Sequence, residues 1–266
     1  MGTTIELTAH NWATGSDNKI HDDVVAARFG FRGGLVPGVT LYGYLTTAVL
    51  ASEGAAWLTG GTCSVRFGSP VYEGDHVRAV LGDEGLLALV NDDGVACATG
   101  AIGGPLQSTP TPTPQPRPTP TPPGVPTARP PSSRPPADAS SLASGTVLES
   151  LRSLPSADAV EHYLAAVGIE DDVCRPIGLV HPAWLLLDAN DILVANVRLG
   201  PWIHVGSEVS FYGPVRVDSA LDVHASVVDH FERSGHRFTV LDVVTFAEGS
   251  AVQRVRHTAI YQPRGV

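Results

Sequence analysis

Two short patterns occur twice in this chain, and both repeats have the same spacing. The residues GLV at 34–36 recur at 178–180, and VRFGSPV at 65–71 recurs as VSFYGPV at 209–215. Residues 34 and 178, like residues 65 and 209, are 144 positions apart. Two separate matches at one offset indicate a duplicated unit, so we expect a fold built from two similar halves.

A proline-rich segment separates the two halves. Residues 105–138 hold 14 of the 22 prolines, most of them alternating with Thr or Ser. Such sequences favour extended, polyproline-like conformations and cannot form a hydrophobic core. We therefore predict a first unit at 1–104, a linker at 105–138 and a second unit at 139–266. A proline-rich recognition motif is the alternative reading of the linker.

Each half is predicted to fold as a helix followed by an antiparallel sheet. Apolar segments at about 39–58 and 179–191 predict the helices. Alternating segments rich in Val, Phe and Thr predict four strands after each helix, at 62–67, 76–81, 86–91 and 95–102, and at 208–211, 220–229, 237–246 and 252–261. This order predicts an α+β fold in which each helix covers one face of a sheet. Joining the two sheets edge to edge would protect strands that are otherwise open.

Composition argues against several functional classes. The net charge of −10 and the isoelectric point near 5.4 do not suit a surface for nucleic acid or anionic membranes. We find no apolar run long enough to span a bilayer and no signal-peptide pattern, so we expect a cytoplasmic protein. The odd cysteine count and the surroundings of Cys63, Cys97 and Cys174 predict buried, reduced thiols rather than disulfides or a metal site.

The candidate site begins at residues 15–23. His21 carries an imidazole, which gives and takes protons near neutral pH. Asn18 and Asp17 precede it by three and four residues, so a helical turn would place all three on one face. The alternative is a solvated helix start capped by Asp17 or Asn18.

A glycine-rich turn then leads into the first predicted helix. Backbone N–H groups of Gly38 and Val39 at the helix start can stabilise an anion, and a proton-transfer group beside them suits acid–base chemistry. A Pro-Gly turn needed for backbone geometry is the compatible alternative. Arg32, in the turn, could bind phosphate, although pairing with a nearby carboxylate is the commoner role.

This stretch resembles the hydratase motif of the MaoC-like enoyl-thioester hydratases and dehydratases. The family pattern is Gly-Asp-x-Asn-Pro-x-His, followed by a Gly-Phe-x-Gly turn and a buried central helix. The residues that match it are Gly15, Asn18, Ile20, His21, Gly30, Phe31 and Gly33. Three positions depart from it: Ser16 stands where the family has its catalytic Asp, Lys19 where it has Pro, and Pro37 where it commonly has His.

The resemblance implies a double hotdog fold, with two antiparallel sheets each wrapped around a central helix. It implies a hydro-lyase in which His21 transfers protons, Asn18 positions water or substrate, and amides at Gly38 and Val39 hold the thioester oxygen. Ser16 and Arg32 would contact the substrate, a small acyl molecule carried on coenzyme A or on a carrier-protein pantetheine arm. No metal or redox cofactor is expected, and a homodimer is possible.

The serine at position 16 leaves other functions open. Asp17 would replace the missing family Asp only if the loop shifted. A tailoring lyase or cyclase acting on a non-thioester metabolite is one alternative, and a non-catalytic acyl-binding protein is another. The second half lacks a His at the matching place, and four of its histidines are expected to be structural: His181, His204, His236 and His257. We therefore expect one working site in the first unit and a second unit that shapes the pocket.

Overall fold

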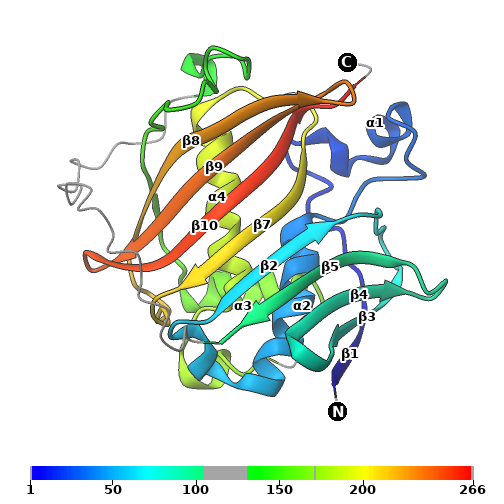
Figure 1. The fold of residues 1–266 in the computed structure, drawn as a ribbon, viewed down its shortest axis with the longest axis vertical. Coiled ribbons are helices and arrows are strands. Elements are labelled where there is room, and N and C mark those ends of the chain that lie inside the picture. Colours follow the sequence, from blue (N-terminus) through cyan, green and yellow to red (C-terminus); the bar gives the residue numbers. More distant parts are fainter. Residues whose placement is uncertain (1, 105–130, 171, 265–266) are drawn as a thin grey trace.

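The computed structural model describes residues 2–104, 131–170 and 172–264. Most of the predicted linker, 105–130, lies outside the described residues. The described chain forms a 10-stranded sheet in the order β1-β3-β4-β5-β2-β7-β10-β9-β8-β6. The longer helices all lie behind this sheet in the view of Figure 1, so that one face of the sheet is covered.

Both units contain a long central helix and a set of antiparallel strands. The first unit comprises β1 (Thr3–Thr8), α1 (Asp23–Arg28), α2 (Gly38–Glu53), β2 (Thr62–Phe67), β3 (His76–Leu81), β4 (Leu86–Asn91) and β5 (Ala96–Gly103). The second comprises β6 (Leu151–Ser153), α3 (Ala157–Ala166), α4 (Pro182–Asn196), β7 (Ile203–Phe211), β8 (Leu221–Arg233), β9 (His236–Ala247) and β10 (Ser250–Gln262). Short 3-10 turns include Lys19–His21, Ala55–Leu58 and Arg175–Ile177.

The sheets of the two units join edge to edge, as predicted. Strand β2 pairs antiparallel with β7, and Cys63 lies opposite Val209 in that register. The pairing makes one continuous sheet out of two halves, and it leaves β1 and the three-residue strand β6 at the outer edges. Because paired edges expose no free backbone groups, this junction protects the two joined edges, β2 and β7, from pairing with other chains.

The duplication seen in the sequence is kept in the backbone hydrogen bonds. The Val36 amide donates to the Val71 carbonyl at 2.8 Å, and the Val180 amide donates to the Val215 carbonyl at 2.8 Å. The two donor residues are 144 positions apart in the sequence, and so are the two acceptor residues. The two units therefore share the connection that holds the start of each central helix against its sheet.

Some elements differ from the sequence-based expectation. The predicted helix at 39–58 ends at Glu53, because Gly54 adopts a positive φ of 66° and its amide caps the Leu50 carbonyl. Strand β7 begins at Ile203, well before the predicted 208, and α4 runs on to Asn196. Strands β1 and β6 and helix α3 are not among the predicted elements.

The two central helices pack directly against each other in one shared core. A Cβ built on Gly43 of α2 would lie 3.0 Å from the Cβ of Ala183 at the start of α4, so the two backbones approach closely there. The thiols of Cys63, Cys97 and Cys174 are buried and free, as predicted. Burial raises the pKa of Cys63 to about 12.

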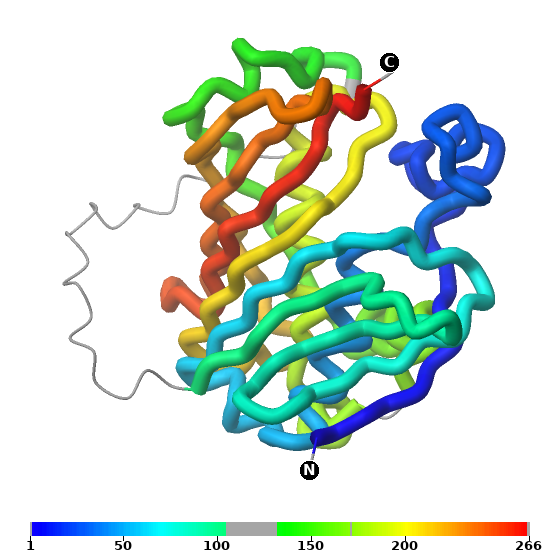
Figure 2. The backbone as a smooth tube through the Cα atoms, turned by 45° about the vertical axis from the view of Figure 1, so that its right-hand side comes forward, coloured from blue at the N-terminus to red at the C-terminus, as the bar shows by residue number. Residues whose placement is uncertain are grey.

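Two peripheral segments complete the structure. The segment with α1 projects beyond the sheet near the start of β7 and is drawn in blue in Figures 1 and 2. The described end of the predicted linker contacts the second unit, where Arg134 donates to the Val194 carbonyl at 2.9 Å. None of the helices in the described part of the chain is long and apolar enough to cross a bilayer.

Candidate active site

A cavity of about 210 Å³ lies between the two units. The first unit contributes the 3-10 turn at Lys19–His21, the residues before α2, and the loop after β2. The second unit contributes Asn190 of α4 and the beginning of β7. Most of the lining is apolar, and the predicted site residues Asn18, His21 and Gly38 all border this space.

His21 is held by both of its ring nitrogens. Its Nδ1 lies 2.7 Å from the Leu35 carbonyl oxygen, which can only accept, so Nδ1 carries the proton. Nε2 then keeps its lone pair and lies 3.3 Å from the amide nitrogen of Asn18. Burial lowers the pKa of His21, and the Leu35 bond partly opposes this shift. The result is a neutral imidazole that can act as a base through Nε2.

Asn18 joins this turn to the second unit. Its Oδ1 accepts from the Trp202 amide at 3.1 Å, and its Nδ2 donates to the Trp202 carbonyl at 3.0 Å. Oδ1 also accepts from the Ile20 amide, which caps the 3-10 turn that carries His21. These backbone partners fix which end of the side-chain amide is the oxygen, and they leave its second N–H for His21.

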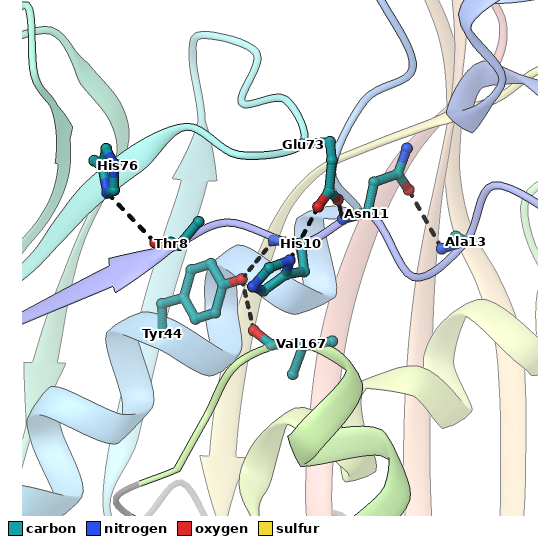
Figure 3. Close-up of polar contacts among 8 residues, drawn as sticks. All are labelled: Thr8, His10, Asn11, Ala13, Tyr44, Glu73, His76 and Val167. Carbon is teal, nitrogen blue, oxygen red and sulfur yellow. Dashed lines mark hydrogen bonds and ion pairs between the residues drawn. The ribbon is translucent and has the colours of Figure 1, made fainter.

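A polar network on the far side of the turn supports the His21 backbone. Asn11 is buried, and its side-chain Nδ2 donates to the His21 carbonyl at 2.9 Å. The backbone amide of Asn11 donates to the Glu73 carboxylate. Figure 3 shows Glu73 between His10 and Asn11, and Tyr44 beside them. The Tyr44 hydroxyl accepts from the His10 amide at 3.1 Å and donates to the Val167 carbonyl at 2.8 Å. The chain leading to the site is thus fixed to α2 and to the second unit.

The start of α2 closes one side of the cavity. The backbone amides of Thr40 and Leu41 donate back to the Pro37 carbonyl at 2.9 and 3.2 Å. The first two helical amides, those of Gly38 and Val39, therefore have no partner within the helix. A Cβ on Gly38 would lie 2.9 Å from Phe67 Cε2 and 3.0 Å from His204 Nδ1. Only glycine therefore fits here without displacing its neighbours.

Several predicted site residues lie outside the cavity. Ser16 Oγ donates to the Asn18 carbonyl at 3.3 Å, and Asp17 is exposed on the surface. Arg32 is exposed too, where it pairs with Asp75 and lies over the Tyr72 ring at 4.2 Å. The Val39 side chain packs in the core. Among the described residues, no acidic side chain lines the cavity.

The second unit supplies cavity residues that the sequence analysis did not propose. Besides Asn190, they are Trp202, Ile203, His204 and Val205. His204 was expected to be structural, and the predicted strand began four residues after it. A strand predicted to begin at Ile203 would have placed His204 beside the junction between the units.

The matching region of the second unit contains a capped turn as well. Asp172 caps a turn there by accepting from the Cys174 and Arg175 amides at 2.8 and 3.1 Å, much as Asn18 caps the turn before His21. The Leu179 amide donates to the Cys174 carbonyl, just as the Leu35 amide donates to the Ile20 carbonyl. Arg175, the residue after Cys174, therefore takes the place that His21 has after Ile20 in the first unit. No group of three or more potential metal ligands occurs among the described residues.

Comparison with solved structures identifies the fold. A conserved hypothetical protein from Mycobacterium tuberculosis, described as having a double hotdog fold, aligns with a TM-score of 0.63 and 16% identity over 97% of this chain and 96% of its own. A protein from Chloroflexus aurantiacus assigned as a MaoC domain dehydratase aligns with a TM-score of 0.60 and 11% identity, over 100% and 95%. A MaoC-like dehydratase gives 0.56 and 10%, over 98% of both chains.

These alignments cover both units, so the chain has the double hotdog fold expected from the resemblance. No protein-family model and no curated protein sequence matches the chain.

Proposed function

We propose that this double hotdog protein is a hydro-lyase that adds water reversibly to the 2-enoyl group of an acyl thioester. The observation that carries the proposal is the neutral imidazole of His21, which borders the same apolar cavity as the open helix start at Gly38. The likeness to structures described as dehydratases agrees with this choice.

The substrate would place its thioester carbonyl at Gly38. A free amide at a helix start stabilises the negative charge that develops on an enolate oxygen, and one such donor is worth about 3 kcal/mol in comparable sites. The acyl chain would occupy the apolar part of the cavity. The coenzyme A or carrier-protein arm would extend to the outside, and the reaction needs no metal or redox cofactor.

A single proton-transfer group suits a cavity without a carboxylate. In hydration, His21 Nε2 takes a proton from water while the water oxygen bonds to C3 of the enoyl group. The π electrons move onto the carbonyl oxygen as an enolate, and the imidazolium then returns the proton to C2 as the carbonyl re-forms. Dehydration reverses these steps. Asn18 holds the imidazole with a 3.3 Å contact, long enough for bound water to replace it.

A second function is supported by the same lack of a carboxylate. A lyase or cyclase acting on a non-thioester metabolite would also use His21 as its base and Gly38 as its anion site. Turnover separates both enzymes from a non-catalytic acyl-binding protein. Activity on a panel of enoyl-coenzyme A thioesters separates the two enzymes.

The decisive test is His21→Ala, assayed by loss of the enoyl-thioester absorbance with crotonyl-coenzyme A. Turnover should fall about 100-fold or more, the usual contribution of a positioned proton-transfer group. Asp17→Asn is the matched control, because Asp17 lies on the surface four residues away and should leave turnover within about twofold. Unchanged turnover in a folded His21→Ala protein would remove this residue from the mechanism.

A further inference from the structure

Three polar side chains form a buried chain on the inner face of the second unit's sheet. His204 Nε2 lies 2.9 Å from Ser207 Oγ, which lies 3.3 Å from Nδ1 of His257. The two imidazole rings are 4.2 Å apart between centroids, and all three residues are buried. His204 also contacts the Phe67 ring edge to face, so its ring plane is fixed from both units.

The remaining ring nitrogen of each histidine lies at an outer end of this chain. His204 Nδ1 and His257 Nε2 are buried and make no hydrogen bond to any other described residue. They differ in their surroundings, because His204 borders the cavity whereas His257 does not. His204 Nδ1 lies 3.0 Å from the place that a Cβ on Gly38, the first residue of α2, would take.

The serine hydroxyl links the protonation of the two rings. Ser207 has one hydrogen to donate, so it donates to one imidazole nitrogen and accepts from the other. In one arrangement His257 Nε2 carries an N–H that stays unsatisfied in the core. In the other, the unsatisfied N–H is on His204 Nδ1, at the cavity. A buried N–H without an acceptor is costly, so a ligand oxygen in the cavity favours the second arrangement.

We propose that His204 belongs to the active site, where its Nδ1–H donates to the carbonyl oxygen of the acyl group bound at Gly38. This inference rests on the proposed function, since it requires an acyl carbonyl in the cavity. Ser207 and His257 act as positioning residues, because in the second arrangement Ser207 accepts from His257 Nδ1 and donates to His204 Nε2, which places the hydrogen of His204 on Nδ1. The enolate oxygen then has two donors, one from each unit.

Neutrality of the two rings suits this role. Burial and the neighbouring His257 hold the pKa of His204 well below its ordinary value, although the Gly206 backbone partly opposes this shift. Burial lowers the pKa of His257 to about 3. His204 can therefore strengthen its hydrogen bond as charge develops on the oxygen, without itself carrying a charge at neutral pH. The base remains His21, across the cavity.

Two substitutions of His204 distinguish contact with the ligand from a structural role. His204→Asn keeps an amide near the position of Nδ1, whereas His204→Gln keeps one near Nε2 and so preserves the contact with Ser207. We expect kcat on crotonyl-coenzyme A to fall about 100-fold in the Gln variant and less than about tenfold in the Asn variant. KM should change less than kcat in both. A purely structural role predicts the opposite order, because it needs the bond to Ser207.

A measurement on the unaltered protein covers the case in which both variants misfold. Histidine nitrogen NMR with ¹⁵N-labelled protein reports which ring nitrogen carries hydrogen. With bound butyryl-coenzyme A, which is saturated and cannot be hydrated, His204 should be protonated on Nδ1 and unprotonated on Nε2. An unprotonated Nδ1 in that complex would overturn the inference.

The two proposals fail in different ways. Full activity of His204→Gln beside an inactive His21→Ala would remove His204 from the site and leave the hydro-lyase assignment standing. Full activity of both variants would remove the assignment of the site. Failure of butyryl-coenzyme A to bind would overturn the substrate class and, with it, the role of His204.

Discussion

The two central helices are copies of one element, yet they begin in different ways. Pro37 and Gly38 precede and open α2, and the equivalent positions before and in α4 are His181 and Pro182. Pro37 offers no side-chain acceptor, and Gly38 leaves its amide at a cavity. His181 instead accepts from the Ala183 amide at 3.1 Å, and Pro182 has no N–H to satisfy.

The comparison shows that a helix start can become a site or a structural joint. Every helix leaves its first amides without intrahelical partners, and these must be satisfied by something else. In the second unit the imidazole of His181 does this, and its other nitrogen lies 3.2 Å from Thr47 of α2. In the first unit, a ligand in the cavity would have to provide the acceptor for the Gly38 amide.

The largest effect is expected from closing the open helix start. Gly38→Ala should reduce turnover about 100-fold, because the new Cβ would meet Phe67 and His204 at about 3 Å and would obstruct the place proposed for the ligand oxygen. The matched change, Pro182→Gly, adds an amide at a position that does not line the candidate active-site cavity and should leave turnover within about twofold. Steady-state assays with crotonyl-coenzyme A compare the two. Equal losses in both variants would mean that the two helix starts have the same role.

A second effect concerns stability and should fall on the other unit. His181→Ala removes a buried cap and its contact with Thr47, and it leaves a small void, so we expect a loss of about 2–3 kcal/mol in the free energy of unfolding. Pro37→Ala at the equivalent position should cost less than about 1 kcal/mol. Urea titrations at neutral pH measure both. A larger loss for Pro37→Ala would reverse the assignment of the structural joint.

A smaller effect is expected from the pH dependence of His181. Burial lowers its pKa to about 4 from 6.5, and Asp172 partly opposes the shift. The unfolded chain therefore binds this proton first as the pH falls below 6.5, and stability is lost down to the folded pKa. Between pH 6.5 and about 5 the loss from His181 alone should be roughly 2 kcal/mol.

The non-titrating variant His181→Asn isolates this contribution, because asparagine also caps helices. Its free energy of unfolding should fall less than that of the unaltered protein over the same pH interval. Burial raises the pKa of Asp188 to about 8, which produces the opposite trend, but this contribution is common to both proteins and cancels in the comparison. Identical pH dependence of the two proteins would show that His181 is not protonated on unfolding.

The sequence predicted the regular parts of the fold closely. Strands β2, β3 and β4 begin and end at the predicted residues, because alternating polarity and glycine turns are local signals. β1 and β6 lie at the outer edges of the sheet. β6 has three residues, too few for a period to emerge, whereas β1 has six, as many as β2. The early start of β7 at Ile203 was missed because the alternation of buried and exposed side chains breaks near that end of the strand. The break lies where the register between β7 and β10 shifts, next to Thr258.

The candidate site was predicted in part. His21, Asn18 and Gly38 do meet at one cavity, because a capped turn and a helix start follow each other along the chain. Asp17 and Arg32 lie outside it, since the directions of adjacent side chains depend on the turn geometry and on partners such as Asp75. The roles proposed for the site residues remain predictions that the substitutions above test.

The sequence alone determined that this protein consists of two similar helix-and-sheet units, because a repeated pattern at a constant offset can be read without a structure. Only the tertiary structure decided which residues face each other between those units. Asn18 and Trp202 are 184 positions apart, and Gly38 and His204 are also distant in the chain. They meet because β2 pairs with β7 in one particular register. Local patterns specify turns and periods, whereas contacts across such a junction depend on packing of the whole molecule.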